Sequence, residues 1–282
     1  MDYRACYEEG CAKLKAADVP DFETDARLLL EYVCHTDMGT LLAHGDRTVS
    51  EEERTRFFAL LEGRAKRMPL QQLIGEQFFC GLSFWVNEHV LIPRQDTEIL
   101  AEEAAKRLKP GMRLLDMCTG SGCILISLLS MKEGVRGVGV DISGEALKVA
   151  AKNAERLLKE NRRPGLYPGD LFGALPEGEK EFDMIVSNPP YIPSEEIEKL
   201  MPEVRDHEPR EALDGSEDGL FFYRRIVEEG ASFLKKEGFL LFEIGCEQGE
   251  AVGELMEAAG FTEVKIIKDY AGLDRVVIGK KR

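Results

Sequence analysis

The fold is decided by residues 114–125, which read LLDMCTGSGCIL. The apolar residues before Asp116 are typical of a buried strand, and the apolar run 123–129 is typical of a helix. The glycines between them allow the backbone to turn sharply and to approach a ligand closely. Because open α/β sheets bind ligands at the carboxyl ends of their strands, this loop predicts a binding site at the end of the first strand.

A glycine-rich turn between a strand and a helix can hold a dinucleotide, a nucleoside or no ligand at all. The dinucleotide fingerprint requires a small residue at position 125, where this chain has Leu125. The loop also lacks the lysine of a phosphate-binding P-loop. A pyrophosphate group is therefore a poor fit to this loop.

Acidic residues stand at or just after the ends of three expected strands. Asp116 is at the end of the first, and Asp141 ends the second, 25 residues later. That spacing is near the offset of about 20 residues at which a carboxylate binds ribose hydroxyls. Asp170 follows the third strand, where its carboxylate can accept from an adenine amino group. Each aspartate alone can equally be a turn residue or a helix cap. Together they predict a nucleoside site without phosphates, which also suits a cationic sulfonium.

Residues 188–191, Asn-Pro-Pro-Tyr, follow the expected strand 182–187. A residue before proline is held in an extended conformation, so Asn188 is presented rather than wound into a helix. The side-chain oxygen of Asn188 and the carbonyl of Pro189 can both accept from one planar NH₂ group, and Tyr191 offers a flat face for stacking. In isolation this run is also a common turn sequence. Downstream of the glycine loop, it predicts a site that points an amide or base nitrogen at a methyl donor.

Five segments resemble a known family. They are Pro69-Leu70-Gln71 with Gly75-Glu76; Val90-Leu91-Ile92-Pro93-Arg94 with Thr97-Glu98; residues 116–122; residues 188–191; and Glu208-Pro209-Arg210-Glu211-Ala212-Leu213. Over nearly its full length the chain resembles the protein-(glutamine-N5) methyltransferases that modify the Gly-Gly-Gln loop of class 1 peptide chain release factors. Asn-Pro-Pro-Tyr alone is shared with amino-directed nucleic-acid methyltransferases, and the combination is much more specific. Gln72 and Gln95 depart from the family's usual pattern, outside the glycine loop and the Asn-Pro-Pro-Tyr run.

The resemblance implies a fold, a cofactor and a set of site residues. The fold is a doubly wound, seven-stranded class I methyltransferase (Rossmann-like) sheet with one reversed strand near its edge, and the cofactor is S-adenosylmethionine. The implied cofactor contacts are Asp116, Cys118, Thr119, Gly120, Ser121, Gly122, Asp141, Asp170, Leu171 and Asn188. The implied substrate contacts are Asn188, Pro189, Pro190, Tyr191 and Arg94. Of these, Asn188, Pro189 and Tyr191 are the expected catalytic residues.

The chain is expected to fold in three parts. Residues 1–72 read as helices, with Asp21 and Ser50 as helix caps, and are interpreted as a small substrate-docking domain. Residues 73–95 are expected to form a linker with a β-hairpin. Residues 96–282 alternate helix and strand, which predicts a mostly parallel sheet covered on both faces. The expected strands are 113–117, 137–140, 165–168, 182–187, 239–244, 262–268 and 274–279, and the expected helices include 143–158 and 219–235.

The composition and net charge of the chain argue against several classes of partner and site. The net charge of −15 argues against nucleic acid as the main partner, because phosphates are bound by basic faces. Seven cysteines without a C-x-x-C pair and four scattered histidines argue against a disulfide framework and a metal site. No apolar run approaches the roughly 20 residues of a membrane span, and the charged N-terminus does not read as a signal peptide. We therefore expect a cytoplasmic protein that acts on a partner protein.

Two alternatives stay open. The same chemistry can act on a glutamine of a ribosomal protein, or on an amino group of a nucleic-acid base. A protein of a different class would bind the cofactor and a partner without activity, although the intact Asn-Pro-Pro-Tyr run argues against it.

Overall fold

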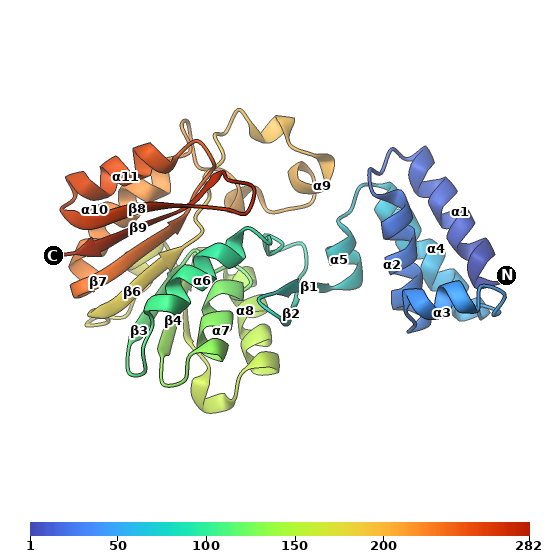
Figure 1. The fold of residues 1–282 in the computed structure, drawn as a ribbon, viewed down its shortest axis with the longest axis horizontal. Coiled ribbons are helices and arrows are strands. Elements are labelled where there is room, and N and C mark those ends of the chain that lie inside the picture. Colours follow the sequence, from blue (N-terminus) through green and yellow to red (C-terminus); the bar gives the residue numbers. More distant parts are fainter. The chain divides into compact units, whose positions relative to one another are not determined.

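The computed structural model describes residues 1–282, which divide into two compact units (Figure 1). Unit 1 comprises Met1–Gly75 together with Met201–His207. Unit 2 comprises Glu76–Leu200 and Glu208–Arg282. The chain therefore leaves unit 2 after Leu200 to contribute a short segment to unit 1, and then returns.

Unit 1 is helical. Its helices are α1 (Tyr3–Ala16), α2 (Phe22–Cys34), α3 (Met38–Ala43), α4 (Glu51–Ala65), α5 (Leu70–Ile74) and α9 (Pro202–Arg205). The predicted capping box is confirmed, because the Glu53 amide donates to the Ser50 hydroxyl and the Ser50 amide donates to the Glu53 carboxylate. Asp21 stands at the N-cap position of α2 but makes no capping hydrogen bond through its side chain. Apolar residues of α1, α2 and α4 form the core.

A buried ion network fixes the segment Met201–His207 within unit 1. The Arg64 guanidinium donates to Asp25 at 2.6 Å and to Glu203 at 2.9 Å, and Arg67 donates to both carboxylate oxygens of Glu203 at 2.6 Å. Burial acts to raise the pKa of Glu203, but the hydrogen bonds from Arg67 and Arg64 outweigh it and lower that pKa to about 2. Because this folded-state pKa lies below the usual glutamate value of 4.5, ionised Glu203 stabilises unit 1 above about pH 4.5, and the stabilisation is lost as the pH falls towards 2.

Replacing Glu203 with alanine is expected to lower the free energy of unfolding by about 3 kcal/mol, because it leaves two guanidinium groups without their shared partner. Urea unfolding at neutral pH measures the change. Glu196→Ala is the matched control, since its pair with Lys199 is exposed and contributes at most about 1 kcal/mol. Equal unfolding midpoints for the two variants would show that the network does not stabilise unit 1.

Unit 2 is built on a seven-stranded sheet of order β5-β4-β3-β6-β7-β9-β8. The strands are β3 (Arg113–Met117), β4 (Arg136–Asp141), β5 (Gly165–Pro168), β6 (Phe182–Ser187), β7 (Leu234–Glu243), β8 (Phe261–Lys268) and β9 (Asp274–Lys281). Strand β9 runs antiparallel to β7 and β8, and the other neighbours are parallel. The expected sheet with one reversed strand near its edge is confirmed.

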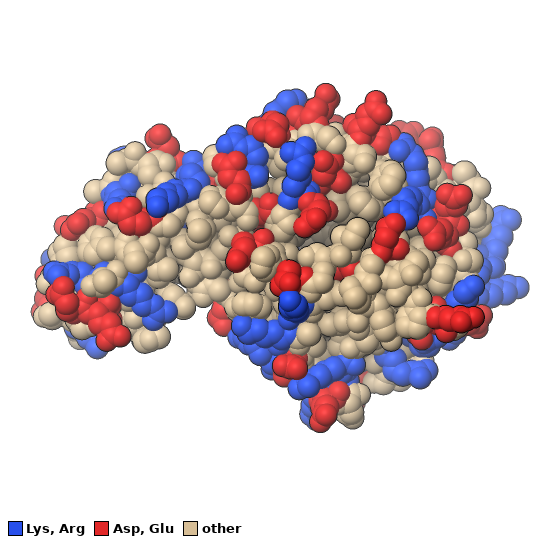
Figure 2. Space-filling view, turned by 180° about the vertical axis from the view of Figure 1, so that it is seen from behind, with Lys and Arg blue, Asp and Glu red and all other residues tan.

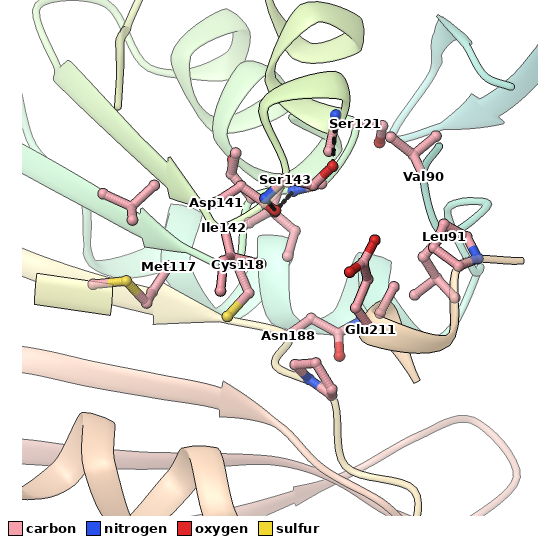
Figure 3. A pocket seen from close by; sticks show the side chains of 18 of the residues that line it. Val90, Leu91, Met117, Cys118, Ser121, Asp141, Ile142, Ser143, Asn188 and Glu211 are labelled. Carbon is pink, nitrogen blue, oxygen red and sulfur yellow. Dashed lines mark hydrogen bonds between the residues drawn. The ribbon is translucent and has the colours of Figure 1, made fainter. Parts of the chain in front are cut away.

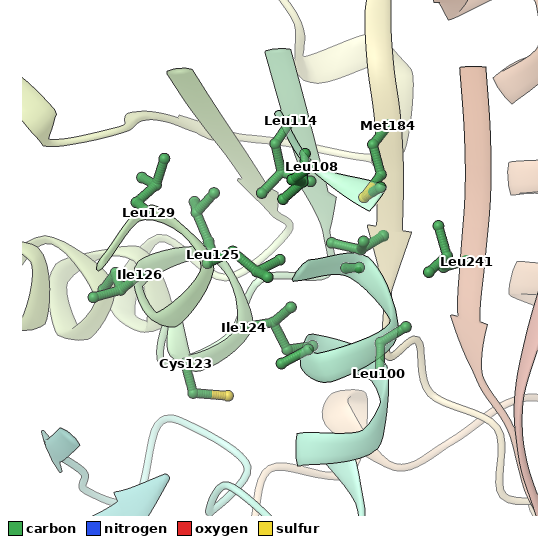
Figure 4. Packing of buried hydrophobic residues seen from close by; sticks show 14 of the residues in the cluster. Leu100, Leu108, Leu114, Cys123, Ile124, Leu125, Ile126, Leu129, Met184 and Leu241 are labelled. Atoms are coloured by element: carbon green, nitrogen blue, oxygen red, sulfur yellow. The ribbon is translucent and has the colours of Figure 1, made fainter. Parts of the chain in front are cut away.

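Helices cover both faces of this sheet (Figure 1). They are α6 (Thr97–Arg107), α7 (Cys123–Met131), α8 (Gly144–Leu157), α10 (Phe221–Phe233) and α11 (Gly249–Ala258). Successive side chains of a strand point to opposite faces, so Leu114 packs with α6 and α7 whereas Leu115 packs with α10 and α11. Figure 4 shows Leu100 of α6 and Ile124 and Leu125 of α7 beside Leu114 and Met184 in the first of these layers.

The expected β-hairpin is present as β1 (Glu76–Phe79) and β2 (Leu82–Trp85), joined by Cys80 and Gly81, both with positive φ. Short 3₁₀ turns lie at Glu160–Arg162, Leu171–Ala174, Ile197–Lys199 and Arg210–Ala212. One expected boundary is wrong, because α10 ends at Phe233 and β7 begins at Leu234, five residues before the expected strand. The reason is tertiary, since Leu234 is buried and pairs with Phe182 of β6.

The surface mixes charges of both signs. On the face shown in Figure 2, lysine and arginine side chains are interspersed with aspartate and glutamate and form no continuous basic stripe. None of the helices has both the length and the apolar character required to cross a membrane. All seven cysteines are unpaired.

Candidate functional site

A cavity of about 330 Å³ opens in unit 2 at the carboxyl ends of β3, β4, β5 and β6. The strand ends contribute Met117, Cys118, Thr119, Gly120, Ser121, Val140, Asp141, Ile142, Ser143, Gly169, Asp170, Leu171, Asn188 and Pro190. The segments that close the cavity contribute His89, Val90, Leu91, Pro93, Arg94, Thr97, Pro209, Glu211, Ala212, Asp214 and Phe222, among others. The structure therefore brings residues 118–121, Asp141, Asp170 and Asn188 together at one edge of the sheet, whereas Asp116 and Gly122 do not line the cavity.

The glycine loop leaves β3 in a tight turn, with positive φ at Cys118, Gly120 and Gly122. A Cβ on Gly122 would lie 2.8 Å from the Ile126 side chain and 3.2 Å from the side chain of Ala150 in α8. Gly122 is thus required for close packing behind the loop, whereas the residues before it line the cavity.

Asp116 lies under the loop and is absent from the cavity wall. The Thr119 hydroxyl donates to one of its carboxylate oxygens at 2.5 Å, and the other oxygen has no hydrogen-bond partner. Burial raises the pKa of Asp116 to about 7, and the charge of nearby Asp141 acts in the same direction. The position of Asp116 suits a residue that holds Thr119 in place.

Asp141 is the carboxylate best placed to meet a ligand (Figure 3). One oxygen accepts from the Gly120 amide at 2.8 Å and the other from the Ser143 amide at 2.9 Å. Each oxygen keeps a lone pair for a further donor. Burial raises the pKa of Asp141, and the charge of Glu211 also raises it.

Asp170 and Leu171 line the same cavity below the end of β5. The Asp170 carboxylate is engaged at the surface, because the Arg225 guanidinium donates to its two oxygens at 2.8 and 2.9 Å. Leu171 is buried and has positive φ. An adenine amino group that bound to Asp170 would have to share the carboxylate with Arg225.

The Asn-Pro-Pro-Tyr loop contributes Asn188 and Pro190 to the cavity wall, whereas Pro189 and Tyr191 do not line the cavity. The Asn188 amide donates to the Thr97 hydroxyl at 3.4 Å. The Tyr191 hydroxyl lies 3.5 Å from a carboxylate oxygen of Glu243. The loop is thus anchored from the sheet side and from the start of α6.

Gly215 and Gly219 allow the segment that follows the Asn-Pro-Pro-Tyr loop to pack closely against the backbone of that loop. A Cβ on Gly215 would lie 2.7 Å from the Tyr191 Cα, and one on Gly219 would collide with the Tyr191 carbonyl oxygen. That carbonyl accepts from the Gln248 amide at 3.0 Å. The position of the loop therefore depends on Gly219, which lies 28 residues after Tyr191 and has a φ of +72°.

Gly219→Ala is expected to displace the Asn-Pro-Pro-Tyr loop and to lower turnover about tenfold, because small displacements of reacting groups are costly. Gly173→Ala is the matched control, since a Cβ there meets no atom within 4 Å. Steady-state kinetics of the two purified variants make the comparison. Equal turnover numbers would show that this glycine does not position the loop.

Arg94 and Glu208 pair across the segments that close the cavity, at 2.6 Å. Glu208 is buried, and its second oxygen has no hydrogen-bond partner. Thr97, Ile142 and Glu211 also line the cavity, although they were not expected as site residues from the sequence. Glu211 extends its carboxylate into the cavity (Figure 3), and Ile142 is an apolar residue with 64% of its surface exposed directly after Asp141. The signal in the sequence is an isoleucine between Asp141, which ends an expected strand, and Ser143, which begins an expected helix.

Comparisons with known proteins find matches to both the helical N-terminal part of the chain and the part that carries the cavity. A model of the PrmC N-terminal domain matches residues 6–75, and a model of the methyltransferase small domain matches residues 95–204. The structure of a methyltransferase from Pyrococcus furiosus is similar in fold, with a TM-score of 0.52 at 20% identity over 71% of this chain and 89% of that one.

Two relatives are similar over nearly the whole sequence. The release factor glutamine methyltransferase of Geobacter sulfurreducens is 43% identical over 260 residues, which cover 91% of this chain and 90% of the relative. That of Caulobacter vibrioides is 42% identical over 271 residues, which cover 95% and 93%. The chain therefore belongs to the release factor glutamine methyltransferase family.

Proposed function

We propose that this protein transfers a methyl group from S-adenosylmethionine to the side-chain amide nitrogen (N5) of the glutamine in the Gly-Gly-Gln motif of class 1 peptide chain release factors. The observation that carries the proposal is the Asn-Pro-Pro-Tyr loop at a cavity whose opposite wall presents Asp141 and the glycine loop. The relatives at 43% and 42% identity support the choice of substrate. Because that substrate acts in translation, the proposal keeps the cytoplasmic location expected from the sequence.

The cavity fits S-adenosylmethionine. Asp141 is held by two backbone amides with lone pairs left for ribose hydroxyls, and Asp170 and Leu171 border the space assigned to adenine. The remaining cofactor contacts are assigned to the loop Cys118, Thr119, Gly120 and Ser121, with Gly122 and Asp116 supporting it from behind and Asn188 at the reacting end. The carboxylates of Asp141 and Glu211 suit a cation. Bound there, the cofactor supplies an electrophilic methyl group on sulfur.

The substrate amide is assigned to the Asn-Pro-Pro-Tyr side. Its nitrogen is a poor nucleophile because the lone pair is delocalised into the carbonyl. Hydrogen bonds accepted by the Asn188 side chain and the Pro189 carbonyl favour the pyramidal nitrogen that develops as the new N–C bond forms. We assign Pro190, which lines the cavity, and Tyr191, which follows it in the same loop, to contacts with the substrate glutamine. Arg94 borders the entrance with its side chain 40% exposed. Holding the nitrogen in line contributes much of the remaining rate enhancement.

The first test is a methyl-transfer assay with labelled S-adenosylmethionine and three candidate substrates: a class 1 release factor, ribosomal proteins and RNA. Label in the release factor alone is the expected result, and a release factor whose Gly-Gly-Gln glutamine is replaced by alanine should remain unlabelled. Label in ribosomal protein or RNA but not in the release factor would refute the proposed substrate.

We also propose that three parts of the chain have separate roles. Residues 1–72 dock the release factor, and residues 96–282 bind the cofactor and transfer the methyl group. Residues 73–95 connect these two parts, and residues 89–91 and 93–94 also contribute to the cavity wall. The proposal is supported by the helical character of unit 1 and by the location of every cavity residue in unit 2.

Deleting residues 1–72 is expected to preserve cofactor binding, measured by calorimetry, and to lower kcat/KM for intact release factor at least about tenfold, the equivalent of 1.4 kcal/mol of docking contacts. A short peptide that contains Gly-Gly-Gln is the control substrate, because it offers no docking surface and should be methylated equally by both forms. Unchanged kcat/KM on the intact factor would refute a docking role.

A further inference from the structure

Glu243 is a carboxylate buried beside the Asn-Pro-Pro-Tyr loop without an assigned role. It is the last residue of β7 and is 1% exposed. Strand β7 pairs in parallel with β6, and Phe242 lies opposite Ser187. The next residues along the two strands are Glu243 and Asn188, so the carboxylate lies level with the asparagine that faces the cavity.

The carboxylate reaches the loop by two routes. Thr97, the first residue of α6, hydrogen-bonds Glu243 through its hydroxyl and accepts from the Asn188 amide nitrogen at 3.4 Å. The Tyr191 hydroxyl lies 3.5 Å from the same carboxylate. The second oxygen of Glu243 has no hydrogen-bond partner.

No structural requirement of the sheet explains a carboxylate at this position. Burying a charge without a close partner is costly, and the nearest guanidinium, Arg275, donates to Asp269 at 3.0 Å and to the Ile244 carbonyl instead. The Tyr223 hydroxyl donates to the backbone carbonyl of Glu243 and not to its carboxylate. An apolar residue would fill the same space at lower cost.

We propose that Glu243 is a positioning residue that determines which end of the Asn188 amide faces the substrate. The inference rests on the proposed function and deepens it, because it explains how the Asn188 oxygen is oriented to accept a hydrogen bond from the substrate glutamine amide.

Glu243 can determine the orientation of the Asn188 amide because the Thr97 hydroxyl has only one proton to donate. An ionised carboxylate can only accept, so Thr97 must donate its proton to Glu243. Its oxygen is then left to accept, and Asn188 must present its NH₂ end to it. The Asn188 oxygen consequently faces away from Thr97 and is available to the substrate NH₂. A protonated Glu243 can donate to Thr97 instead, which frees the hydroxyl proton to bind the Asn188 oxygen and turns the wrong end towards the substrate.

The surroundings of Glu243 permit this titration near neutral pH. Burial raises the pKa of Glu243 to about 7, and the Thr97 hydrogen bond and the charge of Arg275 only partly oppose it. The titratable or charged groups that face it are Asp96 at the start of α6, Tyr191 after β6, Arg275 on β9, Tyr223 on α10 and Cys123 on α7. The working form is the ionised one, so turnover should fall as the pH falls through the pKa of Glu243.

The experiment compares kcat of the wild type and Glu243→Gln on release factor between roughly pH 6 and 8.5, at saturating cofactor. Glutamine keeps the size of the side chain but can donate as well as accept, so it no longer enforces one direction. The ratio of wild-type to variant kcat should be about 10–100 at high pH, by analogy with residues that orient metal ligands through hydrogen bonds. The ratio should approach one at low pH. KM should change little. Exposed Glu247→Gln is the matched control and should follow the wild type throughout.

A second pair of variants tests the relay independently. Thr97→Ser keeps the hydroxyl and should retain wild-type turnover, whereas Thr97→Val removes it and should lose turnover to a degree similar to Glu243→Gln. Calorimetric cofactor binding by each variant verifies that it is folded. A kcat ratio for Glu243→Gln that is one, or that does not depend on pH, overturns the positioning role, as does full activity of Thr97→Val. A wild type that is inactive on release factor would instead refute the proposed function itself, and this inference with it.

Discussion

Asn188→Ala is expected to lower kcat about 10²–10³-fold while KM for the release factor stays nearly unchanged. Asn188 meets the reacting amide, whereas the partner protein offers a much larger surface for binding. The hydrogen bond that Asn188 accepts strengthens as the nitrogen becomes pyramidal, so its loss appears in turnover. Steady-state kinetics with purified release factor measure both constants.

Asn188→Asp is the companion variant. It keeps an acceptor oxygen and should retain more activity than alanine if acceptance from the substrate NH₂ is the main role. It also places a second carboxylate near Glu243 and removes the donor to Thr97. Equal loss in both variants would assign the effect to the asparagine NH₂ group, and near-normal turnover in Asn188→Ala would place the active site elsewhere.

Asp141→Ala is expected to weaken cofactor binding by about 1.5–3 kcal/mol, because it removes a pair of charge-assisted hydrogen bonds to ribose. Isothermal calorimetry with S-adenosylmethionine measures the change. Glu145→Ala, on the exposed side of nearby α8, is the matched control and should bind as the wild type does. Cofactor affinity of the wild type should also fall at low pH, since protonation of Asp141 removes the acceptor. An unchanged affinity in a folded Asp141→Ala protein would contradict the assignment.

The parts of the fold that sequence predicted best are those encoded locally. The strands Arg113–Met117, Gly165–Pro168 and Phe182–Ser187 end where expected, because each is followed directly by a turn sequence: the glycine loop, Gly169 and Asn188-Pro189, respectively. The loop after Met117 was predictable for the same reason. By contrast, the early start of β7 depends on the pairing of Leu234 with Phe182, which no local pattern records.

The site was predictable where a short motif supplies its own geometry, and not where distant segments meet. The cavity brings together Asp141, Asn188 and the glycine loop as expected, but Asp116 supports the loop from below, and Asp170 is held by Arg225. The Asn188–Thr97–Glu243 relay joins residues that are 55 or more positions apart in sequence. The pairing of β6 with β7 brings Asn188 and Glu243 level, and the start of α6 adds Thr97.

Peptide mass mapping of a class 1 release factor, incubated with the purified wild-type protein and S-adenosylmethionine, locates the transferred methyl group. We expect a single added methyl group, located by fragmentation on the side-chain amide nitrogen of the Gly-Gly-Gln glutamine and absent when Asn188→Ala replaces the wild type. A methyl group on another residue or atom, or the same methylation by Asn188→Ala, would contradict it.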